Sequence, residues 1–89
     1  MRVYDIYSFK FPTNEIYVGY TWCGLDYTYD IHKRCSVSPV YEKIKEFPNI
    51  KPELELTNQI GNLYKIQRQI FEKYPNMKIL NVNLWLYGY

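Results

Sequence analysis

Two strand-like runs with a turn-forming segment between them constrain the fold of this chain more than any other feature. Residues 3–11 and 16–21 consist largely of β-branched and aromatic residues, which favour strands. The residues at 11–15, Phe-Pro-Thr-Asn-Glu, supply the proline and asparagine that are typical of turns. The pattern therefore predicts an antiparallel β-hairpin at the start of the chain.

Alternation along the two predicted strands divides their side chains between the two faces of the hairpin. One face would carry Tyr4, Ile6, Ile16, Val18 and Tyr20, and the other would carry Asp5, Tyr7, Phe9, Tyr17, Gly19 and Thr21. We expect the first face to be core. On the second face, Tyr7 and Tyr17 are expected to point the same way.

Two helical segments are predicted after the hairpin. Residues 22–29 have no clear period and are expected to form an exposed loop, after which Asp30 would cap a helical turn over residues 31–35. Ser38 and Pro39 provide a second start, because serine is a good cap and proline suits the first helical position. Apolar residues at helical spacing follow as far as Phe47, and Pro48 would end that helix.

The second half of the chain predicts a strand, a long helix and a final strand or ordered tail. Residues 53–56 alternate polar and apolar side chains, as expected of a half-exposed strand. Thr57 or Asn58 would cap a helix whose apolar stripe comprises Ile60, Leu63, Ile66, Ile70 and Tyr74. Residues 79–87 alternate again.

These elements predict a small α/β domain of the α+β kind, a mainly antiparallel sheet flanked by helices in the order β-β-α-β-α-β. The chain has 89 residues, close to the smallest length that one hydrophobic core supports, so we expect a single domain spanning residues 1–89.

Composition narrows the possible partners and compartment. The formal net charge is only +2, so any DNA contact must be local. No apolar stretch approaches the roughly 18 residues of a membrane span and the start lacks a secretory signal, so a soluble cytoplasmic protein with no membrane partner is expected. Cys23 and Cys35 are expected to be reduced, and with His32 they make a poor zinc set.

Two tripeptides on the hairpin carry a resemblance to a known family. Asp5-Ile6-Tyr7 and Tyr17-Val18-Gly19 resemble the paired tripeptides of the GIY-YIG endonuclease superfamily, with Asp5 where glycine is usual. The resemblance covers roughly residues 3–81. It implies a DNA endonuclease that requires a divalent cation, magnesium or manganese.

Three further positions match the family pattern downstream. Ile31-His32-Lys33-Arg34 resembles its Leu-x-x-Arg run, although later in the chain than usual. Ile66 to Tyr74 resembles the helical run that carries the metal-binding glutamate, and places Gln67 at that position. Leu80-Asn81 resembles the asparagine-containing end of the pattern.

The resemblance implies a role for each of these residues. Tyr7, Tyr17, His32 and Arg34 would be catalytic, with Tyr7 positioning or deprotonating water, His32 carrying protons and Arg34 stabilising phosphate charge. Gly19, Lys33 and Asn81 would contact the substrate, and Gln67 would stand at the metal position. A neutral amide is a poorer ligand for a hard cation than a carboxylate. Asp5 is a better substitute for that carboxylate than Glu42 or Glu72.

Each role has a structural alternative. The tyrosines can be half-buried strand aromatics, Arg34 and His32 part of a solvated helix face, Lys33 surface charge, and Gln67 a hydrogen-bonded residue at the core edge. The amide at residue 67 is either an introduced substitution or a natural loss of the ligand.

Three functions therefore stay open. The first is a metal-dependent DNA endonuclease. The second is a catalytically silent binding or inhibitory module, of viral or mobile-element origin, that contacts a protein partner through residues 22–29. The third is an unrelated α/β domain that matches the tripeptides by chance.

Overall fold

The computed structural model describes residues 2–81. Within that range the strands are β1 (Tyr4–Phe11), β2 (Glu15–Thr21), β3 (Glu53–Gln59) and β4 (Lys78–Ile79). The helices are α1 (Leu25–Arg34), α2 (Tyr41–Glu46) and α3 (Leu63–Lys73). The predicted fold class is confirmed. Both helical segments predicted after the hairpin are present as α1 and α2, although the predicted order β-β-α-β-α-β counts only one helix there.

The strands form one sheet in the order β3-β1-β2-β4. β1 pairs antiparallel with both β2 and β3, whereas β4 runs parallel to β2. The predicted hairpin is confirmed: Asn14 has a positive φ of 65° and donates its N–H to Phe11, which closes the turn. Tyr7 lies opposite Gly19 in the register of the hairpin.

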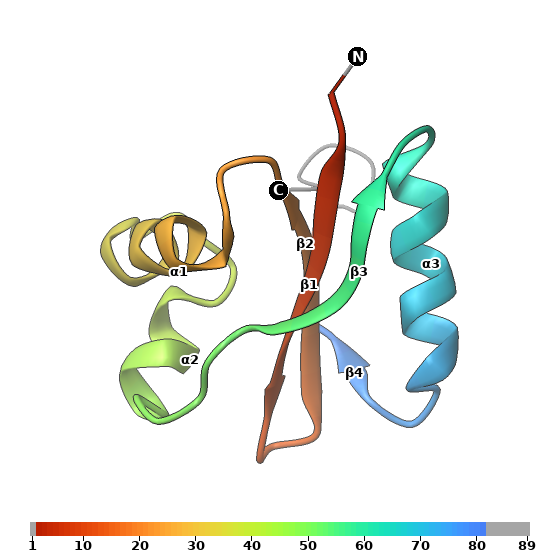
Figure 1. Ribbon diagram of the computed structural model, residues 1–89. Helices are drawn as coiled ribbons and strands as arrows, with labels where there is room; N and C mark the ends of the chain where they lie inside the picture. The colour runs from red at the N-terminus through yellow and green to blue at the C-terminus, as the bar shows by residue number, and fades with distance from the viewer. Residues whose placement is uncertain (1, 82–89) are drawn as a thin grey trace.

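Helices cover both faces of the sheet, with α1 and α2 on one face and α3 on the other (Figure 1). The α1/α2 face buries Tyr7, Phe9, Phe11 and Tyr17 with Val40 and Ile44, and the α3 face buries Ile6, Ile16 and Val18 with Ile70 and Phe71. The predicted division of side chains between the faces is therefore confirmed. Both faces are core, and the tyrosine face is buried as fully as the other.

The prediction of a loop over residues 22–29 is wrong, because α1 begins at Leu25. Gly24, with a φ of 97°, is the residue before the helix, and Leu25 and Tyr29 pack against the core of the α1/α2 face. Asp30 therefore lies inside the helix, where its carboxylate pairs with Arg34, and it is not a cap.

Three other predicted boundaries need correction. α2 begins at Tyr41 and not directly after Ser38. The hydroxyl of Ser38 accepts a hydrogen bond from the N–H of Val40, the residue before the helix. Thr57 and Asn58 belong to β3, and Asn62 caps α3 by accepting from the N–H of Lys65. Ile60 consequently lies outside the helix and is 54% exposed.

The predicted final strand is only partly described. β4 ends at Ile79, and residues 82–87 of that prediction lie outside the described residues. Within residues 2–81, no helix has both the length and the apolar character needed to cross a membrane.

An irregularity in β3 turns Glu55 toward the interior. Ile6 pairs with Leu56 and Tyr7 with Leu54, so Glu55 is an extra residue in the β3 strand. Its carboxylate is 5% exposed and accepts hydrogen bonds from Ser8, Lys73 and Tyr74. Burial alone would raise the pKa of Glu55, but these hydrogen bonds and the charge of Lys10 outweigh it and lower that pKa.

We expect acid to destabilise the protein through Glu55. Because the folded-state pKa is lowered, the stabilisation is present above the unfolded-state pKa of about 4.3 and is lost as the pH falls through the folded-state value. Urea unfolding at pH 7 and pH 3 should show Glu55→Gln to be less stable than wild type at pH 7 and less sensitive to acid. An equal acid dependence in both proteins would contradict this assignment.

Candidate functional site

Tyr7, His32 and Ser38 form a hydrogen-bonded chain beneath α1. The hydroxyl of Tyr7 lies 2.8 Å from Nε2 of His32, and Oγ of Ser38 lies 2.6 Å from Nδ1. β1 supplies the tyrosine, α1 the histidine, and the segment before α2 the serine. Both ring nitrogens of His32 are therefore engaged by side chains of the same domain.

Burial keeps the side chains of Tyr7 and His32 uncharged. Tyr7 is 0% exposed and His32 is 5% exposed. Burial, and next the nearby Tyr17, raises the pKa of Tyr7 far above its ordinary range, and burial lowers the pKa of His32 to about 4. At neutral pH the phenol keeps its proton, and the imidazole donates through one nitrogen and accepts through the other.

Tyr17 and Gly19 of β2 complete the surroundings of the phenol. The ring of Tyr17 is centred 6.3 Å from that of Tyr7 and 5.4 Å from that of His32. A Cβ atom added to Gly19 would lie 2.5 Å from Cζ of Tyr7. The missing side chain of Gly19 thus makes room for the phenol of the same domain.

The remaining residues proposed from the resemblance lie elsewhere. The side chain of Arg34 is 70% exposed and its guanidinium lies 2.6 Å from the carboxylate of Asp30. The Nζ atom of Lys33 lies over the ring of Tyr29, 4.4 Å from its centroid. The structure therefore brings Tyr7, Tyr17, His32 and Gly19 together and leaves Arg34 and Lys33 on the outer side of α1.

Gln67 and Asn81 meet at the backbone of Val18. Gln67 is fully buried on α3, and its Nε2 donates to the carbonyl of Val18 at 2.9 Å. Asn81 donates to the same carbonyl at 2.9 Å and accepts from the N–H of Val18 at 3.0 Å. α3 covers the face of the sheet opposite Tyr7, so residue 67 is separated from the tyrosines by the sheet.

The residues at the expected metal position do not fit a divalent cation. The buried amide of Gln67 uses its N–H to bind a backbone carbonyl, and Asp5 accepts from the N–H of Asn58 on β3. Across residues 2–81, no group of three or more His, Cys, Asp or Glu side chains is arranged to hold a metal ion. Hard cations need several oxygen ligands at one point.

A pocket of about 340 Å³ opens beside His32, between the end of β2 and α1. Its aromatic and aliphatic walls are Tyr20, Trp22, Tyr27 and Ile31, and its polar lining is Thr21, Cys23, Thr28 and His32. Trp22 is 57% exposed and Tyr27 is 56% exposed. We call this the Trp22 pocket.

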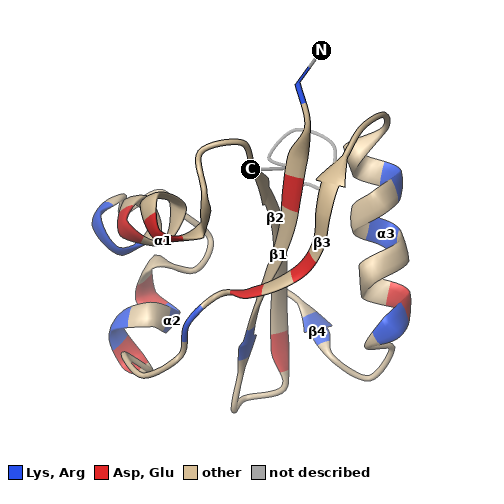
Figure 2. Ribbon diagram, in the orientation of Figure 1, with Lys and Arg blue, Asp and Glu red and all other residues tan. Residues whose placement is uncertain are grey.

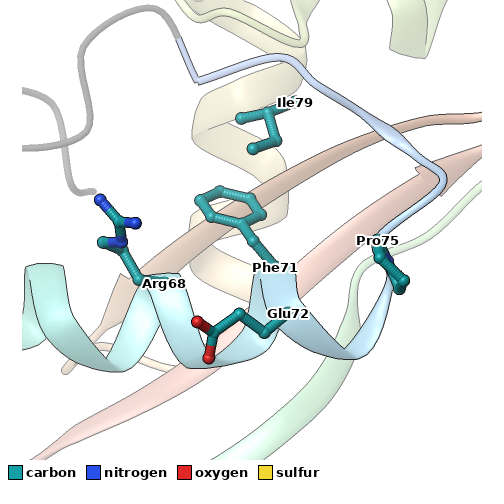
Figure 3. A pocket seen from close by; sticks show the side chains of 5 residues that line it. All are labelled: Arg68, Phe71, Glu72, Pro75 and Ile79. Atoms are coloured by element: carbon teal, nitrogen blue, oxygen red, sulfur yellow. The ribbon is translucent and has the colours of Figure 1, made fainter.

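A second pocket of about 330 Å³ lies between the end of α3 and β4. Figure 3 shows Phe71 and Ile79 facing each other there, with the charged side chains of Arg68 and Glu72 beside them. The Trp22 pocket is the better candidate site, because it has the exposed rings and adjoins the buried histidine.

Sequence reasoning singled out the Trp22 to Tyr29 segment as a contact surface but missed two features. Ser38 was expected only as a helix cap, and the hydroxyl pair of Thr21 and Thr28, 2.7 Å apart, was not foreseen. The spacing of Leu25, Tyr29 and His32 on one helical face was the signal for α1.

These features define a small α+β domain with a buried tyrosine–histidine pair, hydrogen-bonded to a half-buried serine, and an aromatic surface pocket. Comparison with protein-family models, curated proteins and solved structures gave no match to the chain.

Proposed function

We propose that this chain is a GIY-YIG-type domain that does not hydrolyse phosphodiesters and acts as a binding module through the Trp22 pocket. One contrast carries the proposal: Tyr7, Tyr17 and His32 are at most 5% exposed, whereas Trp22 and Tyr27 beside them are more than half exposed. The groups expected to react are in the core, and the groups suited to contact are at the surface.

The arrangement of the polar groups argues against catalysis. Hydrolysis requires an activated water and positive charge at the same phosphate. Tyr7 and His32 hydrogen-bond to each other, Arg34 binds Asp30, and Gln67 lies across the sheet. A phosphate bound by the exposed guanidinium of Arg34 could meet Tyr7 and His32 only if those buried side chains became accessible.

Exposed rings in one pocket favour a binding role. A contiguous apolar patch on a small domain usually marks an interaction site, and Trp and Tyr contribute strongly to binding energy at the centre of interfaces. Ile31, 39% exposed, extends the patch along α1.

A DNA endonuclease is the second candidate, favoured by the meeting of Tyr7, Tyr17 and His32 on one face of the sheet. In that case residue 67 would need a carboxylate, and the buried tyrosines would have to become accessible to the substrate. The silent module is favoured instead because, within residues 2–81, no group of three or more His, Cys, Asp or Glu side chains is arranged to hold a metal ion.

Cleavage of supercoiled and branched DNA with magnesium or manganese separates the two candidates. We expect neither the wild-type chain nor Gln67→Glu to cut. Cutting by wild type would overturn the silent module. Cutting only by Gln67→Glu, abolished when Tyr7→Phe is added, would establish a nuclease site that lacks its metal ligand. Circular dichroism at the assay pH must show that each variant is folded.

A further inference from the structure

The lining of the Trp22 pocket carries no formal charge. No Asp, Glu, Lys or Arg is among its lining residues in the described part of the chain, and His32 is neutral because burial lowers its pKa to about 4. A cation placed there would lose water without gaining an opposite charge, and an anion would meet only Arg2, whose guanidinium already lies over the ring of Trp22. The pocket therefore suits an uncharged, largely apolar group.

The polar groups of the pocket are suited to donate hydrogen bonds. Oγ1 of Thr21 accepts from the N–H of Cys23 at 3.0 Å and is hydrogen-bonded to the hydroxyl of Thr28 at 2.7 Å. The mutual hydrogen bond uses one of the two hydroxyl protons, so the threonine pair keeps one proton to donate. The indole of Trp22 can only donate, and the hydroxyl of Tyr27 can do so.

The charges around the pocket do not favour nucleic acid. Arg2 stacks over Trp22 at 4.1 Å, Lys33 stacks over Tyr29, and Arg34 is paired with Asp30. Figure 2 shows acidic and basic residues interspersed on α1 and α2. Proteins that stack bases on aromatic rings also provide a positively charged groove for the phosphates, whereas the acidic residues among the basic ones on α1 and α2 would repel phosphates there (Figure 2).

A proline-rich peptide fits the pocket in three respects: it is uncharged and apolar, it offers carbonyl acceptors, and it needs no cationic groove. A proline ring is apolar and uncharged, its carbonyl accepts hydrogen bonds, and its nitrogen carries no proton to be left unpaired. Proline-rich segments also keep an extended conformation before binding, which reduces the entropy lost on docking in aromatic grooves.

We propose that the Trp22 pocket binds a proline-rich segment of a partner protein. The proline rings pack against Trp22 and Tyr27, and the peptide carbonyls accept from the indole of Trp22 and from the hydroxyl pair of Thr21 and Thr28. This inference rests on the proposed function, because it names the partner that the binding module recognises.

Titration of the ¹⁵N-labelled protein with a capped peptide of six prolines tests the proposal. We expect shifts in the amide signals of residues 21–31 and in the indole signal of Trp22, and none with a capped Gly-Ser peptide of the same length. Trp22→Ala should weaken binding about tenfold or more, because it removes the largest ring that lines the pocket. Trp22→Phe, which keeps a ring but loses the indole N–H, should give an intermediate loss.

Val37→Ala is the matched control, since Val37 is 85% exposed and does not line the pocket. It should bind the peptide as wild type does. Absence of shifts, or equal affinity in Trp22→Ala, overturns the proposal. Shifts at the pocket with a thymidine oligonucleotide instead of the peptide would also overturn it, in favour of nucleic acid. DNA cleavage by wild type would overturn the silent module whatever the peptide does, so the two failures are distinguishable.

Discussion

Gln67→Glu is expected to lower the free energy of unfolding by about 4 kcal/mol at pH 8, the equivalent of raising the pKa of a buried glutamate by about 3 units. The amide of Gln67 is fully buried and donates to the carbonyl of Val18. A carboxylate in its place would lose that donor, bring a negative oxygen toward the carbonyl, and be removed from water.

The loss should depend on pH in a defined direction. Since the folded protein would raise the pKa of the introduced carboxyl above its unfolded-state value, the variant approaches wild-type stability below about pH 4 and loses stability as the pH rises. Urea unfolding of wild type and Gln67→Glu at pH 4, 6 and 8 measures their difference in the free energy of unfolding. Both proteins contain Glu55, so its acid dependence cancels in that difference.

Gln67→Met is the matched control for the charge. Its side chain is uncharged and of similar length, so it should cost less than Gln67→Glu at pH 8, and its loss relative to wild type should not vary with pH. If Gln67→Glu is as stable as wild type at pH 8, then residue 67 is accessible to water and the case for the endonuclease is strengthened.

Gly19→Ala is expected to destabilise the protein by about 3 kcal/mol, the upper part of the range for added atoms in a packed core. The new methyl group would lie 2.5 Å from Cζ of Tyr7, whose ring is completely buried and tied to His32. The ring is packed among the buried side chains of the α1/α2 face, so moving it away would disturb that packing. Thermal or urea unfolding measures the loss.

A double-mutant cycle with Tyr7→Phe tests the cause. Removing the hydroxyl releases the ring from His32 and reduces the clash, so the double variant should be less destabilised than the sum of the two single variants. Strict additivity would show that Gly19→Ala acts on the strand without involving Tyr7.

Sequence patterns predicted the elements whose side chains follow one simple period. The hairpin alternates cleanly over both strands, and α3 repeats its apolar residues at steps of three and four, so both were found. α1 was placed too late because its inward face contains His32, a polar residue that becomes suited to the core only through its bonds to Tyr7 and Ser38. β3 was predicted too short because Thr57 and Asn58, residue types that often cap helices, continue the strand instead.

The candidate site was predictable only where it depended on strand register. Alternation placed Tyr7 and Tyr17 on one face, and the structure has them there. Whether the tyrosines are buried could not be deduced from the sequence, since the same alternation fits a solvated binding surface or a core. The separation of Gln67 from Tyr7 follows from the crossing of the chain from one face to the other, which short-range patterns do not encode.

The pairing of Asn81 with Val18 has a consequence for how the sheet assembles. β4 has only two residues in the ladder, too few to choose one alignment against β2 by backbone bonds alone. The carboxamide of Asn81 offers a donor and an acceptor side by side, as a peptide group does, and occupies the next place in that ladder. Sliding the chain by one position would bring Leu80, which has no such group, to Val18. The side chain of Asn81 thus favours the observed alignment of β4 over that shifted one.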